Sequence, residues 1–195
     1  MSANGWATCR TGTLARPNVF STGRSARRPG INTGNWEMLG AQLDAADYLA
    51  RLTEELARVD QSAMRQWADL TFAAWQQGKF VYVFGNGGSG TTATHISEDL
   101  GKSSLREADL TDESRRRLKI MSLTDNVGWI LALGNDVGYD SIFVQQLMNY
   151  GQAGDLAVAI SGSGNSENVL QAVDWANRHG LTTFALTGFD GGKLK

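Results

Sequence analysis

Apolar residues recur every three or four positions in two successive stretches, 38–59 and 62–77, as they do along one face of an amphipathic helix. The stretches are separated by Asp60-Gln61-Ser62, where capping residues favour a break between two helices. Gly78 follows the second stretch and is a typical helix-ending residue. The pattern predicts a helical pair over 38–78, whose apolar stripes face a core or a subunit interface.

Beyond this pair, short apolar runs alternate with longer amphipathic stretches. The runs predict strands at 80–84, 119–123, 156–160 and 181–186, and the stretches predict helices near 91–101, 127–133, 139–150 and 166–179. Residues 102–117 are polar and are interpreted as a surface excursion. The alternation predicts an α/β fold of three αβα layers, with a doubly wound parallel sheet of the flavodoxin or Rossmann type. Ligands of such sheets bind outside the carboxyl ends of the strands.

The first 36 residues differ in composition from the rest of the chain. They hold both prolines and five arginines but no acidic residue, and they show little apolar periodicity. We interpret residues 1–36 as a disordered tail or an upstream extension, with Met38 as a candidate start. The alternative is a transit peptide, because the segment is rich in arginine and free of acids. Residues 37–195 then form the folded domain.

Charge and cysteine content exclude several classes of function. Residues 37–195 carry all 20 acidic residues and 13 of the 18 basic ones, a net charge of −7, which argues against nucleic-acid binding. Cys9 is the single cysteine, so neither an internal disulfide nor a cysteine metal site is expected. No apolar run approaches the roughly 20 residues that span a bilayer, and no secretory signal is present. These features indicate a cytoplasmic protein without membrane partners.

A loop of serines and glycines follows the predicted strand 156–160. Its hydroxyls come from Ser161, Ser163 and Ser166, and Gly162 and Gly164 let the backbone approach a ligand closely. A helix begins directly after the loop and points its free N–H groups at it. This combination predicts a site for a phosphate monoester, and the alternative is an ordinary turn with a serine cap. The sequence Gly-Lys-Ser/Thr of nucleoside triphosphate sites is absent, so no nucleotide cofactor is expected.

A second glycine-rich loop, residues 85–90, follows the strand predicted at 80–84. Its glycines match G-x-G-x-x-G, which by itself is weak evidence for a dinucleotide. The acids near the required distance, Glu107 and Asp109, lie in a polar stretch rather than after a strand. The loop by itself therefore does not favour a dinucleotide site, which is kept as an alternative.

The run Gly85-Asn86-Gly87-Gly88-Ser89, followed by His95 and by an acid four residues later, resembles the sugar isomerase (SIS) domain family. Within that family the pattern resembles the phosphoheptose isomerase branch. Three further segments agree with it in the same order along the chain, namely 134–136, 161–166 and 186–193. The resemblance covers residues 38–195.

The resemblance implies an aldose–ketose isomerase of heptose biosynthesis, which converts sedoheptulose 7-phosphate to D-glycero-D-manno-heptose 7-phosphate through an enediol. It also implies a homotetramer and a bound zinc ion. The residues that it assigns to the phosphate are Ser161, Gly162, Ser163 and Ser166. Those that it assigns to the sugar are Asn86, Gly87, Gly88, Ser89, Asn135 and Asp136. His95 matches a zinc ligand, and Asp99 stands where the family has a glutamate that binds metal and transfers a proton.

The spacing of His95 and Asp99 agrees with that assignment, because residues four apart share one helix face and suit one metal or one acid–base pair. Asp99 is one methylene shorter than the family's glutamate, and Glu98 lies about 100° away around the helix. His179 sits at a predicted helix end, where it favours the helix dipole.

The family pattern continues past Lys195 with a strand and a helix that bears a glutamine and a histidine. We therefore expect a C-terminally incomplete SIS domain with half of the proton-transfer site. Two alternatives to the heptose isomerase remain open. One is a non-catalytic phosphosugar-binding module that associates with a replication initiator, and the other is an isomerase of another phosphosugar.

Overall fold

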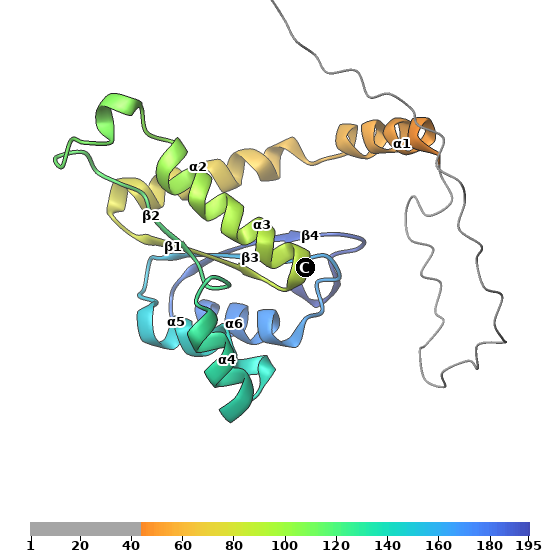
Figure 1. The fold of residues 1–195 in the computed structure, drawn as a ribbon. Helices are drawn as coiled ribbons and strands as arrows, with labels where there is room; N and C mark the ends of the chain where they lie inside the picture. The colour runs from red at the N-terminus through yellow and green to blue at the C-terminus, as the bar shows by residue number, and fades with distance from the viewer. Residues whose placement is uncertain (1–43) are drawn as a thin grey trace, which may run out of the picture. The chain divides into compact units, whose positions relative to one another are not determined.

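The computed structural model describes residues 44–195 and divides after Ala57 into two compact units (Figure 1). The described part of the first unit is helix α1 (Ala45–Ala57), which begins where the backbone N–H of Asp47 donates to Oδ1 of Asp44 at 2.9 Å. None of the α1 residues is buried, and its leucines are exposed along the predicted stripe. The helix predicted over 38–59 is thus confirmed from 45 to 57, and its first residues, like the predictions for residues 1–36, lie outside the described residues.

Helix α2 (Gln61–Gln77) opens the second unit and has defined signals at both ends. Asp60 accepts hydrogen bonds from the hydroxyl and the backbone N–H of Ser62, and from the N–H of Ala63. These bonds, that of the hydroxyl above all, hold the pKa of the Asp60 carboxyl below its usual value. Gly78 ends the helix in the left-handed conformation, with φ of 67°. The predicted end at residue 77 is therefore confirmed, and the helix begins one residue before the predicted start at 62. Among the described residues, none of the helices is long and apolar enough to cross a membrane.

Four parallel strands form the sheet, in the order β2-β1-β3-β4. They are β1 (Phe80–Gly85), β2 (Lys119–Ser122), β3 (Leu156–Ser161) and β4 (Thr182–Thr187). The chain runs outward from β1 to β2 on one side and from β3 to β4 on the other, so the strand order reverses between β1 and β3. Open α/β sheets bind ligands at such a reversal, outside the carboxyl ends of the strands.

Helices cover both faces of the sheet, as predicted for the three-layer fold (Figure 1). Helices α2 and α3 (Gly87–Glu98) lie on one face, where Ala74 and Ala93 pack against Val81, Val83 and Val158. On the other face lie α4 (Val127–Asp136), α5 (Val144–Tyr150) and α6 (Glu167–Arg178). There, Phe84 and Ala159 of the sheet pack with residues of α5 and α6. Strands buried on both faces explain the continuous apolar runs in the sequence.

The predicted boundaries are wrong in three places on the carboxyl side of the sheet. Helix α3 begins at Gly87 rather than near residue 91, because the N–H groups of Ser89 and Gly90 already bond to the carbonyl of Asn86. Helix α4 extends to Asp136 instead of ending at 133. The helix predicted over 139–150 divides into a 3-10 turn (Tyr139–Ser141) and α5. Tertiary contacts and backbone hydrogen bonds decide where a helix begins and ends, whereas the spacing of apolar residues shows only its approximate location.

The polar excursion after α3 contains a π-helical segment (Asp99–Ser103) and a 3-10 turn (Glu107–Asp109). Three of its arginines, Arg115, Arg116 and Arg117, bond to protein groups near its end. Arg116 donates to the backbone carbonyl of Gln76 and lies over the Trp75 ring, with 5.9 Å from its guanidinium carbon to the ring centroid. Arg117 donates to the carbonyls of Asp109 and Leu110, and Arg115 lies 2.9 Å from the Asp109 carboxylate. These bonds hold the excursion against the end of α2 and within itself.

Asp155 joins the start of β1 to the turn before β3, and its replacement by asparagine tests that junction. Its two carboxylate oxygens accept from the N–H groups of Phe80 at 2.9 Å and Gln152 at 2.8 Å, and the residue is only 3% exposed. Asp155→Asn places an N–H group against one of these donors, so we expect a loss of about 1–3 kcal/mol in the free energy of unfolding. Urea denaturation measures it.

Asp174→Asn is the matched control, because Asp174 is an exposed partner of Arg178 on α6. Exposed pairs of this kind contribute at most about 1 kcal/mol. Equal losses in the two variants would contradict the role given to Asp155.

Candidate active site

The two glycine-rich loops lie side by side because their strands are neighbours in the sheet. In the register of β1 and β3, Gly85 stands opposite Ile160. A Cβ atom added to Gly85 would lie 2.5 Å from the carbonyl oxygen of Ile160, so the close approach of the strand ends requires glycine. The loop after β1 leads into α3 and the loop after β3 leads into α6. Two helix N-termini therefore begin at the reversal of strand order.

Neither of these helices is capped by the side chain that precedes it. Asn86 is the N-cap residue of α3 and Ser166 that of α6, and neither side chain accepts a hydrogen bond from its helix. Asparagine and serine usually make that bond. Since the first N–H groups of a helix have no partner within the helix, both helices direct unused donors toward the loops. Such an arrangement attracts an anion.

The serine loop gathers the four residues predicted for the phosphate. Ser161 is 4% exposed, and its Oγ lies 3.3 Å from the Oγ of Ser166. Ser163 is exposed, and its hydroxyl accepts from the N–H of Asn165 at 3.2 Å. A Cβ atom added to Gly162 would meet no atom within 4 Å, so the backbone there is open to a ligand. The loop offers hydroxyls and accessible backbone in one place.

The segment after β4 holds the serine loop in shape. Gly188 N–H donates to the carbonyl of Gly162 at 3.0 Å, and Leu194 N–H donates to that of Gly164 at 3.2 Å. The side chain of Asn165 bonds within the loop and also accepts from the N–H of Lys193 at 3.1 Å. Gly164 has φ of +65°, and a Cβ atom there would lie 1.8 Å from the carbonyl oxygen of Gly191. The predictions did not include Asn165, although its place inside the serine loop was a signal.

The first loop presents open glycines and a firmly held asparagine. Cβ atoms added to Gly87 or Gly88 would meet nothing within 4 Å. The carboxamide of Asn86 exchanges two 2.9 Å hydrogen bonds with that of Asn168 on α6, and it accepts a third from the hydroxyl of Tyr139 at 3.0 Å. The sequence predicted a sugar-binding role for Asn86 through Ser89 but not for Asn168 or Tyr139, because no local pattern links residues so distant in the chain.

His95 and Asp99 come together as their spacing predicts. The Nε2 atom of His95 lies 3.2 Å from Oδ2 of Asp99, and their side chains are 75% and 58% exposed. Asp99 is the first residue of the π-helical segment, a rare form that is frequent at functional sites. Within residues 44–195, no group of three or more histidine, cysteine or acidic side chains is placed to hold a metal. A catalytic zinc needs three protein ligands, so this pair alone does not fit zinc.

Asn135 and Asp136 lie in the last turn of α4 and are exposed. The side chain of Asn135 donates to Asp136 at 2.7 Å, so these two residues bond to each other rather than to the loops. The contact from this part of the chain to the first loop comes instead from Tyr139, three residues beyond Asp136. His179 lies at the C-terminal end of α6, opposite to the end that faces the loops.

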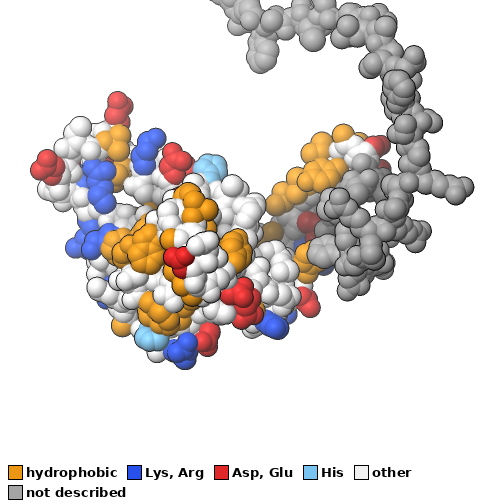
Figure 2. Space-filling model, turned by 60° about the horizontal axis from the view of Figure 1, so that its bottom comes forward, with side chains coloured by type: hydrophobic (Ala, Val, Ile, Leu, Met, Phe, Trp, Pro, Cys, Tyr) orange, Lys and Arg blue, Asp and Glu red, His pale blue; other side chains and the backbone are white. Residues whose placement is uncertain are grey.

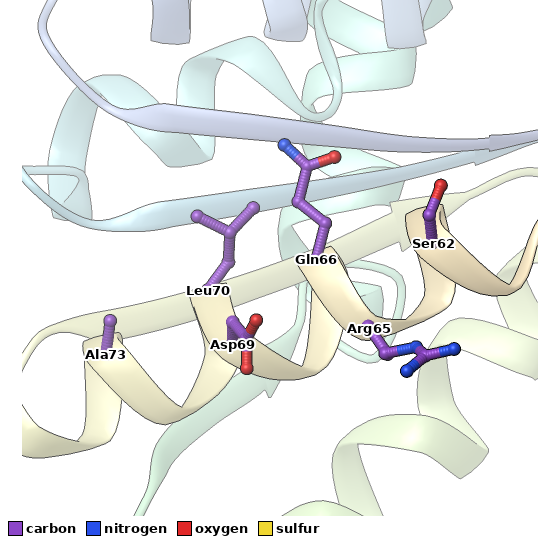
Figure 3. A pocket seen from close by; sticks show the side chains of 6 residues that line it. All are labelled: Ser62, Arg65, Gln66, Asp69, Leu70 and Ala73. Carbon is purple, nitrogen blue, oxygen red and sulfur yellow. The ribbon is translucent and has the colours of Figure 1, made fainter.

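Two hollows lie outside the loops. One follows α2 and is lined by residues of that helix alone, with Gln66 and Leu70 pointing to the same side (Figure 3). The other lies beside α3 and β2, where Thr94 donates to the carboxylate of Asp125. Neither includes a residue of the serine loop, so the candidate site remains at the strand ends.

Comparison with known proteins identifies relatives along most of the chain. The family model of the SIS domain matches residues 46–188. A phosphoheptose isomerase of Chlorobium phaeobacteroides is 37% identical over 153 residues, which are 78% of this chain and 66% of that relative. One of Rhodospirillum rubrum is 39% identical over 132 residues, which are 68% of this chain and 66% of that relative. The chain thus spans just under two thirds of the length of these two relatives.

Solved structures agree with this similarity. A phosphoheptose isomerase of Francisella tularensis superimposes with a TM-score of 0.65 at 31% identity, over 78% of this chain and 80% of that one. A phosphoheptose isomerase of Neisseria gonorrhoeae superimposes with a TM-score of 0.60 at 36% identity, over 74% of this chain and 72% of that one. The family model covers more than half of the sequence, and the similarity extends through both loops and all four strands. This chain therefore belongs to the SIS domain family.

Proposed function

We propose that this chain isomerises a phosphosugar, converting sedoheptulose 7-phosphate to D-glycero-D-manno-heptose 7-phosphate. The observation that carries the proposal is the pair of glycine-rich loops at the strand reversal, where two helices begin without a side-chain cap and the serine loop adds three hydroxyls. The relatives named phosphoheptose isomerase support the choice of substrate. In this assignment the serine loop binds the phosphate and the first loop binds the sugar.

Phosphate binding is the task of Ser161, Gly162, Ser163 and Ser166. A phosphate monoester carries three acceptor oxygens and is matched by hydroxyl and backbone donors at a helix N-terminus. The bonds from the segment after β4 fix the loop before the ligand arrives. Fixing the loop in advance lowers the entropy that binding would otherwise cost.

Isomerisation requires proton movement along the first two carbons of the sugar. A base takes a proton from C1 of the ketose, and an enediol forms as O2 gains a proton. The aldose results when C2 receives a proton and the hydroxyl of C1 loses one. Asp99 is our candidate for the base, with His95 at 3.2 Å as its partner. Hydrogen-bond donors near the first loop would stabilise the charge that develops on the enediol oxygens.

Zinc binding remains a prediction. His95 and Asp99 provide two ligands, and the described part of the chain places no third beside them. A homotetramer is likewise a proposal, which exposed apolar residues support. Val127 and Leu131 of α4, and Val137 directly after it, are more than half exposed. Figure 2 shows hydrophobic side chains gathered on the face that it turns toward the viewer.

Replacing Ser163 by alanine tests the phosphate site. Because its hydroxyl is exposed and bonds only within the loop, Ser163→Ala leaves the fold intact and removes one donor to the ligand. We expect affinity for sedoheptulose 7-phosphate to fall by about 1–3 kcal/mol, measured by calorimetric titration. Ser114→Ala is the control, since the Ser114 hydroxyl bonds to Asp112 in the polar excursion. An unchanged dissociation constant in Ser163→Ala would remove this residue from the site.

Replacing Gly88 by alanine should have opposite effects on the stability of the protein and on phosphosugar binding at the first loop. Gly88 lies in the first turn of α3 with space around it, so alanine fits, and it stabilises a helix by roughly 0.5–1 kcal/mol relative to glycine. If the sugar rests on this backbone, the methyl group obstructs it. We expect a higher melting temperature together with weaker phosphosugar binding. Gly128→Ala on α4, where space is also open, should raise stability without affecting binding. Unchanged binding in Gly88→Ala would contradict the assignment of the sugar.

Turnover of sedoheptulose 7-phosphate tests the reaction itself. We expect the product aldose to appear with the unaltered chain and to fall at least about tenfold with Asp99→Asn, which keeps the shape of the side chain but not its basicity. Glu98→Gln, at the neighbouring position on the helix, is the control. Tight binding of the sugar phosphate without any turnover would instead favour a non-catalytic binding module.

A further inference from the structure

Asn86 is the N-cap residue of α3, yet its carboxamide bonds to other side chains rather than to the N–H groups of the helix. Its oxygen accepts from Nδ2 of Asn168 at 2.9 Å and from the hydroxyl of Tyr139 at 3.0 Å, and its nitrogen donates to Oδ1 of Asn168 at 2.9 Å. A carboxamide has two acceptor positions on oxygen and two N–H donors. Both acceptor positions and one donor of Asn86 are therefore used, and one N–H remains.

The two partners come from separate parts of the fold. Asn168 lies in the first turn of α6, is 2% exposed, and reaches the first loop across the reversal between β1 and β3. Tyr139 begins the 3-10 turn after α4 and follows Gly138, whose φ of +129° redirects the chain there. Their bonds fix Asn86 from two directions. The side chain consequently cannot turn to accept from the N–H groups at the start of α3.

From this arrangement we propose that Asn168 and Tyr139 are positioning residues for the sugar site. They keep the Asn86 carboxamide off the N-terminus of α3, so the N–H group of Gly88 stays available, and they aim the remaining N–H of Asn86 at the sugar. The inference rests on the proposed function, because it assigns these bonds a role in phosphosugar binding. It adds two residues that belong to neither glycine-rich loop.

The network also couples the two loops. Asn168 follows Ser166 by two residues at the start of α6, while Asn86 precedes the first turn of α3. The reciprocal amide bonds thus hold the sugar loop in a fixed relation to the phosphate loop. A phosphosugar that spans both loops benefits from this relation, whereas inorganic phosphate, bound at the serine loop alone, does not depend on it.

The test compares Tyr139→Phe and Asn168→Ala with the unaltered full chain, using sedoheptulose 7-phosphate and inorganic phosphate as separate probes. Tyr139 is exposed, so Tyr139→Phe removes one hydroxyl without disturbing packing, whereas Asn168→Ala also empties a buried position. We expect Tyr139→Phe to weaken sugar phosphate binding about twofold to tenfold, the value of one hydrogen bond, and Asn168→Ala to weaken it further. Affinity for inorganic phosphate and the melting temperature of Tyr139→Phe should not change.

Tyr150→Phe is the matched control, because it removes a hydroxyl from an exposed tyrosine outside the network. Side-chain amide signals in nitrogen-15 NMR spectra give a second readout, with the Asn86 pair identified by its loss in Asn86→Asp. These signals should move in Tyr139→Phe and stay in place in Tyr150→Phe, with no ligand present.

Unchanged sugar phosphate affinity in both variants, or unmoved Asn86 signals in Tyr139→Phe, would overturn the positioning role while leaving the proposed function standing. A parallel loss of affinity for both probes would also overturn it, because that result reports a general disturbance of the site. An unaltered chain that binds neither probe would overturn the proposed function, and the role of the network in binding would fall with it.

Discussion

The close pairing of β1 with β3 is the constraint on which the rest of the structure depends. Gly85 meets the backbone at Ile160 so closely that any side chain there would collide with a carbonyl oxygen. Because the strands touch to their ends, the loops that leave them emerge side by side and α3 and α6 begin at one place. The reversal of strand order between β1 and β3 therefore brings two helix N-termini to one site.

At this site two helices lack the stabilising side-chain cap, which leaves their first N–H groups available to a ligand. Asn86 and Ser166 both stand where a side chain usually caps a helix, and neither does so. Their side chains form hydrogen bonds with other side chains instead. Asn86 bonds to Asn168 and Tyr139, and Ser166 bonds to Ser161. The N–H groups left at the two helices are the donors that an anionic ligand needs. The strand ends beside these loops, Gly85 and Ser161, are buried, and the segment after β4 bonds to the serine loop, so the fold tolerates the uncapped helix ends.

The residues proposed for proton transfer contrast with the loops proposed to bind the phosphosugar. Asn165 and the segment after β4 fix the serine loop from several directions, whereas His95 and Asp99 are held chiefly by each other and face solvent. Binding residues are thus organised by this chain's own backbone. His95 and Asp99 are instead largely exposed, and an exposed pair in water is weakly organised for catalysis.

The sequence by itself determined the α/β class, all four strands and both glycine-rich loops, because buried parallel strands and loops of small residues leave strong local patterns. It also predicted that His95 and Asp99 meet, since helical spacing alone decides that contact. Only the tertiary structure decided that α3 starts at Gly87 and that Asn168 and Tyr139 hold Asn86. The bonds to Asn86 join residues more than 50 positions apart, so their geometry exists only once the sheet has brought its strand ends together. The start of α3 depends on backbone hydrogen bonds to the Asn86 carbonyl, which the apolar pattern does not reveal.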